Sequence, residues 1–244
     1  MKNTSISKHA VKRHAFKSLF LHQIRDIEEL GEMVERLLKK EVHSLSEMVT
    51  EKTSCLPFPE RDELLGWYDG DLDQLTHEFP RLQRYALFAT AMGMIESHLH
   101  FLCKHAQQIC GIQIAVSDLN GKGVVRAMTY LTKVCRFRIS TGQRSEADHL
   151  TMLQKMRNAI IHNEGTPPDC DLEAIRQYRK RCPHFDLSTR NQIRPKESFL
   201  GMAIHLGQLL VTTIIAEIEK AERRAQQGAG VVREPRCGSR APQP

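Results

Sequence analysis

The most informative stretch of this chain is residues 155–165, KMRNAIIHNEG, where an arginine, an asparagine and a histidine lie on one short apolar segment. Apolar residues recur before and within it at helical spacing, which predicts a helix with one buried face. Asn158 and His162 are four residues apart and share a second face. Arg157 lies about 140° from His162 around an ideal helix. A glycine and two prolines follow, so the helix should end close to His162.

An arginine and a histidine together suit one reaction, the cleavage of a phosphodiester by an internal 2′-hydroxyl. The histidine can transfer protons near neutral pH, and the arginine can hold the charge that develops on phosphorus. That reaction needs no metal ion and no other cofactor. Surface arginines and helix-end histidines are also common, so a purely structural role for both residues is the alternative.

Arg157 and Asn158, with three residues between Asn158 and His162, resemble the signature of HEPN domains. In that signature an arginine, usually followed by a polar residue, precedes a histidine by a few positions. Residues 94–99, MIESHL, look like the earlier core helix of the superfamily, which often carries an acidic residue. Residues 118–131 look like the start of a helix found in several HEPN-like families. The resemblance covers roughly residues 80–220.

The resemblance implies a metal-independent endoribonuclease that works as a homodimer with two motifs at the interface. His162 would act as general base or acid, and Arg157 would stabilise the phosphorane. Asn158 would position the phosphate or orient His162, and Glu96 would orient Arg157. By family analogy, the setting is a stress response or defence against mobile elements.

Two other hypotheses come from the same resemblance. Some HEPN domains have lost the motif or act only in binding, so the chain could be a non-catalytic dimeric module that binds RNA, a nucleotide or a protein partner. The third hypothesis is a toxin of a toxin–antitoxin pair, silenced by a separately encoded antitoxin-like partner that covers the motif.

Glu96 needs an explanation of its own because it lies in the middle of an apolar helical pattern. A buried carboxylate requires a partner, and Arg157 from the later helix is the candidate. The alternative is that Glu96 faces the surface.

The composition indicates one sizeable domain in a reducing compartment. Hydrophobic residues make up 41% of 244 residues, which is enough for a core. The seven cysteines form no paired framework, which favours reduced thiols and a cytoplasmic location. No secretory signal is visible, and the apolar run at 209–216 is too short to span a membrane. The net charge of +6 is concentrated in basic segments at 1–25, 176–196 and 221–244, on a mildly acidic body.

Helical periodicity dominates the chain, and no β-rich region or internal repeat is evident. A long amphipathic helix is predicted at residues 9–52, packed within the chain or paired with a second subunit. The segment 53–79 is punctuated by prolines and glycines and is expected to be irregular, apart from a short helix at 62–68. Further elements are predicted in this order: helices at 81–109, 124–137, 145–162 and 170–182, a small hairpin or extended segment at 185–193, and a helix at 197–225.

The expected fold class is therefore all-α. We expect a HEPN-like helical bundle at residues 79–225, preceded by an N-terminal helical arm and connecting loop at 1–78. The glycine, proline and arginine content of residues 226–244 predicts a disordered tail.

The predicted helix at 170–182 directly follows the Arg–His motif and is strongly basic. The candidate RNA-binding residues on it are Arg176, Tyr178, Arg179, Lys180 and Arg181. Four cations and one aromatic ring suit phosphate contacts and base stacking, although an ordinary exposed helix can have this composition. No metal site is expected, because the acids at 69, 71 and 73 lack the rest of a calcium loop.

Overall fold

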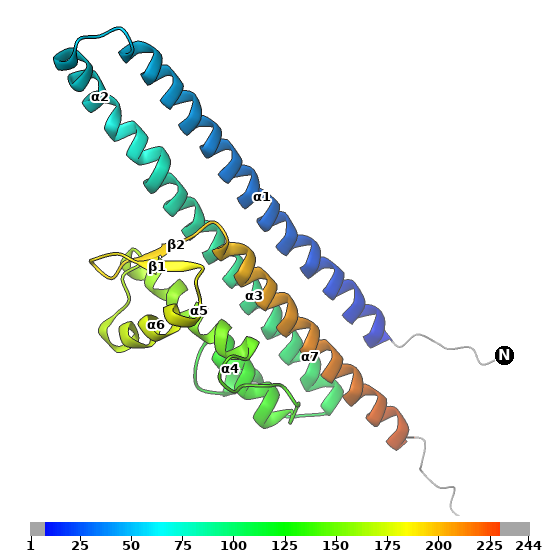
Figure 1. The fold of residues 1–244 in the computed structure, drawn as a ribbon. Coiled ribbons are helices and arrows are strands. Elements are labelled where there is room, and N and C mark those ends of the chain that lie inside the picture. The colour runs from blue at the N-terminus through cyan, green and yellow to red at the C-terminus, as the bar shows by residue number, and fades with distance from the viewer. Residues whose placement is uncertain (1–7, 230–244) are drawn as a thin grey trace, which may run out of the picture.

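The computed structural model describes residues 8–229 and confirms the all-α fold class (Figure 1). The described elements, in chain order, are α1 (Lys8–Thr53), α2 (Phe58–Asp73), a π-helical turn (Gln74–Glu78), α3 (Phe79–Cys110), a 3₁₀ turn (Val116–Asp118), α4 (Gly123–Thr129), a second π-helical turn (Tyr130–Val134), α5 (Glu146–Asn163), α6 (Asp169–Arg181), β1 (Phe185–Leu187), β2 (Ile193–Pro195) and α7 (Phe199–Ala229). β1 and β2 pair antiparallel in the expected hairpin. Of the tail predicted at 226–244, residues 226–229 belong to α7 and the rest lies outside the described residues.

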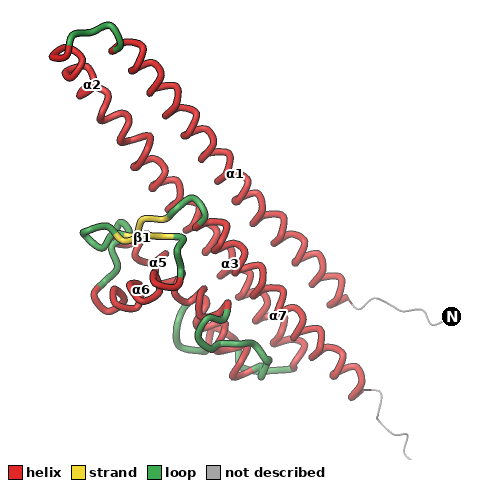
Figure 2. Tube along the Cα trace, viewed as in Figure 1, coloured by secondary structure: helices red, strands yellow, loops and turns green. Residues whose placement is uncertain are grey.

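The segment 53–79 is helical, and the expectation of an irregular segment was wrong. A short turn after α1 leads into α2, and α2 continues through the first π-helical turn into α3, antiparallel to α1 (Figure 2). Pro57 is the N-cap of α2, and Pro59 lies in its first turn, where a missing N–H costs nothing. The π-helical turn comes just before Pro80, so the helical ladder is already irregular where that proline lacks its donor.

The hydrophobic core lies where α3, α5, α7 and the first half of α1 meet. Phe20 and Ile24 of α1 are fully buried in the same cluster as Phe88 and Ile95 of α3. The first half of α1 therefore packs within the chain. Between residues 36 and 79, in contrast, only Val49 and Thr53 are buried. Of the arm expected at 1–78, only the second half of α1 and α2 thus extend beyond the core, as a pair of helices.

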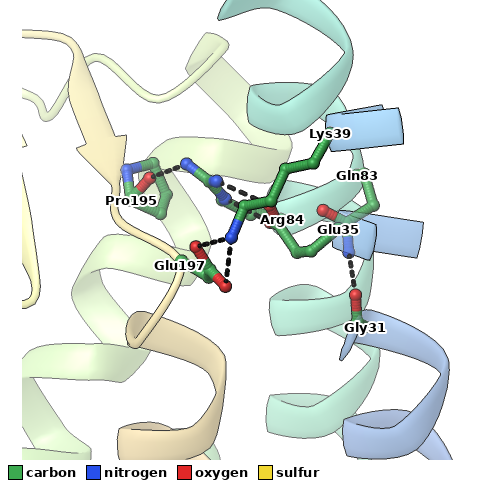
Figure 3. A network of polar contacts seen from close by, with 7 residues as sticks. All are labelled: Gly31, Glu35, Lys39, Gln83, Arg84, Pro195 and Glu197. Carbon is green, nitrogen blue, oxygen red and sulfur yellow. Dashed lines mark hydrogen bonds and ion pairs between the residues drawn. The ribbon is translucent and has the colours of Figure 1, made fainter. Parts of the chain in front are cut away.

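A polar network joins α1, α3 and the chain that leads into α7 (Figure 3). Arg84 of α3 donates to both oxygens of Glu35 of α1, at 2.6 and 2.8 Å, and to the Pro195 carbonyl at 3.0 Å. Nearby, Lys39 donates to the Glu197 carboxylate at 2.7 Å. The side chain of Glu35 is only 10% exposed, whereas that of Lys39 is 64% exposed. The first ion pair is thus a buried link between elements, and the second is a surface pair.

α7 is long and apolar enough, over Phe199–Gln227, to meet the length and composition criteria for a membrane span. Half of its most apolar window is buried in the structure, and Val211, Ile214 and Ile218 lie in the core. A buried core helix meets the same criteria, and α7 has that role in this fold. α4, α5, α6 and the hairpin lie together on the side of α3 away from α1 (Figure 1).

Candidate functional site

α5 carries the Arg–His motif, and its N-cap is Ser145, the first residue of the helix predicted at 145–162. The Ser145 hydroxyl accepts a hydrogen bond from the Asp148 backbone N–H at 3.2 Å. The Asp148 carboxylate does not complete a capping box with Ser145, because it accepts from the Arg144 N–H at 3.0 Å. The helix therefore has a fixed start, which places the motif in its last two turns.

The end of α5 is fixed by Gly165, which follows the helix with a φ of +85°. Its N–H donates to the Ala159 carbonyl at 3.0 Å, and its carbonyl accepts from the Ile193 N–H at 2.9 Å. A Cβ atom here would lie 2.0 Å from the hydroxyl oxygen of Tyr85, which itself donates to the Ile193 carbonyl at 2.5 Å. The end of α5 is thus held against α3 and β2 at a contact that only glycine permits.

Arg157 is partly buried and forms no direct ion pair with an acid among the described residues. One Nη atom donates to the Asn158 side-chain oxygen at 3.1 Å. The Nε atom is buried and has no hydrogen-bond partner within residues 8–229. No carboxylate therefore hydrogen-bonds to Arg157 within the described part of the chain, and the charge of Glu96 acts on it there without a direct contact.

His162 lies on the last turn of α5 and is exposed, as is Asn158. Its ring makes no hydrogen bond or ion pair with any described residue. The structure therefore brings Arg157 and Asn158 together, and it has no hydrogen bond between His162 and either of them within the described chain. The angular separation expected from the helical wheel is present in the fold.

Glu96 is partly buried on α3, but it does not form the ion pair with Arg157 that the sequence suggested. One carboxylate oxygen is buried without a hydrogen-bond partner in the described structure. Burial raises the pKa of Glu96, and the nearby charge of Arg157 opposes that shift. The same oxygen lies 2.8 Å from where a Cβ on Gly123 would stand, and Gly123 has a φ of +54°. Glu96 thus reaches the start of α4 and does not hold the Arg157 guanidinium directly.

Glu96 and Arg157 line one open cavity of about 360 Å³ between α3, α4 and α5. The full lining is Gly93, Glu96, Ser97, His100, Val116, Gly123, Arg126, Ala127 and Arg157. His100 and Arg126 are polar lining residues that the sequence reading missed. Burial, followed by the charges of Lys104 and Arg126, lowers the pKa of His100. The spacing of four residues between Glu96 and His100 could have revealed His100, whereas nothing local points to Arg126.

Most of the cations on α6 are already engaged within the chain. The three arginines have these acceptors: Asn191 for Arg176 at 2.9 Å, Asp186 for Arg179 at 2.9 Å, and Asp148 for Arg181 at 2.8 Å. Lys180 is exposed and makes no hydrogen bond or ion pair with a described residue. Each of these arginines would have to exchange its acceptor for a phosphate, so the composition of α6 by itself does not establish a phosphate-binding surface.

Tyr178 is 1% exposed, so its ring is not available to stack on a base. Its hydroxyl lies 2.8 Å from the His149 ring nitrogen, and its ring packs beside Phe185. The aromatic residue of the predicted RNA-binding set is thus a core residue. Helical periodicity could have shown this, since Tyr178 is three residues after the buried Ile175.

No group of three or more histidines, cysteines or acids is placed to hold a metal ion within residues 8–229. No protein-family model matches this chain, and comparison with curated proteins and with solved structures gives no match. The proposed function therefore rests on the motif, the cavity and their chemistry.

Proposed function

We propose that this protein is a metal-independent endoribonuclease that cleaves RNA by attack of a 2′-hydroxyl on the neighbouring phosphorus. The observation that carries the proposal is the guanidinium of Arg157 at the edge of an open cavity, with an Nε atom that has no acceptor and with no ion-paired acid in residues 8–229. A partly buried guanidinium with an N–H that lacks an acceptor is costly, and a phosphate oxygen is a strong acceptor for such a group. By family analogy, the proposed setting is a cytoplasmic stress response or defence.

The roles of the residues follow from where they lie on α5. Arg157 binds the phosphate and stabilises the charge that builds up on it. Asn158, held beside the guanidinium at 3.1 Å, positions the same phosphate. His162 transfers protons, and its exposed position leaves it free to reach a substrate.

A homodimer solves the geometric problem that a single chain leaves. His162 and Arg157 leave α5 in different directions, so the His162 of one subunit would serve the Arg157 of the other. Exposed Ile161, at 47% exposure, lies between them in sequence and offers an apolar contact for such a pairing.

The direct test is cleavage of single-stranded RNA in EDTA by wild type, Arg157→Ala and His162→Ala. We expect each variant to lose about 10²–10³-fold in rate, and wild-type products to end in 2′,3′-cyclic phosphates. His77→Ala is the matched control, because His77 is exposed on the π-helical turn before α3. Equal cleavage by wild type and His162→Ala would contradict the proposal.

A mixing experiment tests whether the site is shared between subunits. When Arg157→Ala and His162→Ala chains are coexpressed, about half of the dimers contain one chain of each kind. Each mixed dimer has one intact site out of two, so about a quarter of the wild-type activity should return. No recovery, with mixed dimers present by mass, would contradict a shared site.

The second candidate function is a non-catalytic dimeric module that binds RNA, a nucleotide or a protein partner. The observation that favours it is the lack of contact between His162 and Arg157 within the described chain. RNA binding without cleavage by wild type would support it. An antitoxin-like protein that covers the motif is the corresponding partner if the chain is a toxin, and adding it would abolish cleavage.

A further inference from the structure

The cavity between α3, α4 and α5 has an unusual combination of groups. Two arginines from different helices, Arg126 and Arg157, line it, and neither forms an ion pair with any acid in residues 8–229. Like charges placed at one cavity repel each other, and an anion bound between them removes that cost. Ser97 and His100 supply further hydrogen-bond donors on the α3 side.

A carboxylate stands in the same cavity beside the two arginines. The Glu96 side chain is partly exposed, one of its two oxygens is buried, and the carboxylate accepts no hydrogen bond from the described residues. A simple anion would leave this carboxylate without a donor and would be repelled by it. The ligand that satisfies all three groups carries an anionic group for the arginines and a hydroxyl donor for the carboxylate.

We infer that this cavity binds one ribose-phosphate unit of RNA, with the phosphate on Arg126 and Arg157 and the ribose 2′-hydroxyl donating to Glu96. The inference rests on the proposed function for the identification of the ligand as RNA. The volume of about 360 Å³ lies at the small end of ligand sites, which suits a single nucleotide unit.

The arrangement divides two tasks between the residues. The arginines supply affinity that RNA and DNA share, because both have phosphates. Glu96 supplies the preference for RNA, because the 2′-hydroxyl is the group that DNA lacks. Gly123 allows the Glu96 carboxylate to lie close to the start of α4, since a Cβ on residue 123 would lie 2.8 Å from the carboxylate oxygen.

The test is fluorescence anisotropy with a labelled oligouridine RNA and the matching oligodeoxyuridine DNA, in EDTA. All proteins carry His162→Ala so that the RNA stays intact, and His162 does not line the cavity. We expect the parent to bind RNA about tenfold more tightly than DNA, the value of one hydrogen bond to a charged acceptor. Arg126→Gln should weaken the binding of both by about tenfold.

Two further variants separate the roles within the cavity. Glu96→Ala should abolish the preference for RNA while leaving DNA binding unchanged or tighter. Arg61→Gln, which removes the same charge from an exposed site on α2, should leave both affinities as they were. Thermal melts followed by circular dichroism test whether each variant folds. If Glu96→Ala does not fold, Glu96→Gln is used in its place, because the glutamine retains one acceptor oxygen.

The outcomes distinguish this inference from the nuclease proposal. If Arg126→Gln binds RNA like Arg61→Gln, or if Glu96→Ala keeps the full RNA preference, the cavity inference is wrong even where His162-dependent cleavage is established. If the cavity variants behave as expected but wild type does not cleave RNA, the cavity binds RNA and the nuclease proposal fails. If the parent binds neither oligonucleotide, the cavity inference is overturned.

Discussion

Replacing Gly165 with alanine should loosen the end of α5, directly after the turn that carries His162. The backbone of Gly165 has a φ of +85°, which costs alanine about 1 kcal/mol relative to glycine. The new methyl group would also stand 2.0 Å from the Tyr85 hydroxyl, so the ring has to move. Moving it breaks the hydrogen bond to the Ile193 carbonyl and leaves buried groups unpaired, at about 1–3 kcal/mol. The expected loss in the free energy of unfolding is about 2–4 kcal/mol.

Gly111→Ala separates the two contributions. Gly111 has a φ of +62°, similar to that of Gly165, but no atom lies within 4 Å of the position that a Cβ would take. Gly111→Ala should therefore lose only the backbone part, about 1 kcal/mol. The difference between the two variants measures the contact with Tyr85.

The assay is urea unfolding followed by circular dichroism, at one pH, for wild type and both glycine variants. Tyr85→Phe provides the cross-check, because removing the hydroxyl also removes the shortest contact with the new methyl group. Tyr85→Phe should cost less in the Gly165→Ala background than in wild type. The reasoning is refuted if Gly165→Ala is as stable as Gly111→Ala, or if the effects of Tyr85→Phe and Gly165→Ala add without coupling.

Two further predictions concern charge. Glu35→Ala leaves Arg84 without its carboxylate partner and should lower the free energy of unfolding by about 3 kcal/mol. Lys39→Ala breaks only an exposed pair and should lower it by less than about 1 kcal/mol. Equal losses for the two variants in chemical denaturation would contradict this prediction. Burial raises the pKa of Glu96, so its contribution to stability is full at pH values below 4.5 and is lost as the pH rises through the folded-state pKa. The stability of Glu96→Gln relative to wild type should therefore increase as the pH rises from acidic to neutral. The increase should be about 1 kcal/mol or less, because the side chain is partly exposed. A difference in melting temperature between the two proteins that does not change with pH would contradict this prediction.

Features that depend on neighbours in the chain could be predicted from the sequence. The start of α5 at Ser145, its end beside a glycine and the contact between Arg157 and Asn158 all involve residues within a few positions of one another. The length of α1 and the hairpin after α6 follow in the same way from periodicity and turn residues. Hydrogen bonding over three to five residues decides such features, and the local sequence contains that information.

Other features are set by distant parts of the chain and could not be predicted from the local sequence. The segment 53–79 is helical despite its prolines and glycines because it pairs with α1. Arginines on α6 look free in the sequence, but their partners lie on β1, on α5 and in the hairpin turn.

The candidate site combines both kinds of information. Its α5 half, Arg157 and Asn158, was readable from the sequence, and so was the angular separation from His162. The cavity, with Arg126 beside Arg157 and a buried oxygen of Glu96 facing Gly123, exists only because three helices pack together. Helical periodicity tells which side of a helix a residue occupies, but the packing of helices decides which residues from different helices share one space.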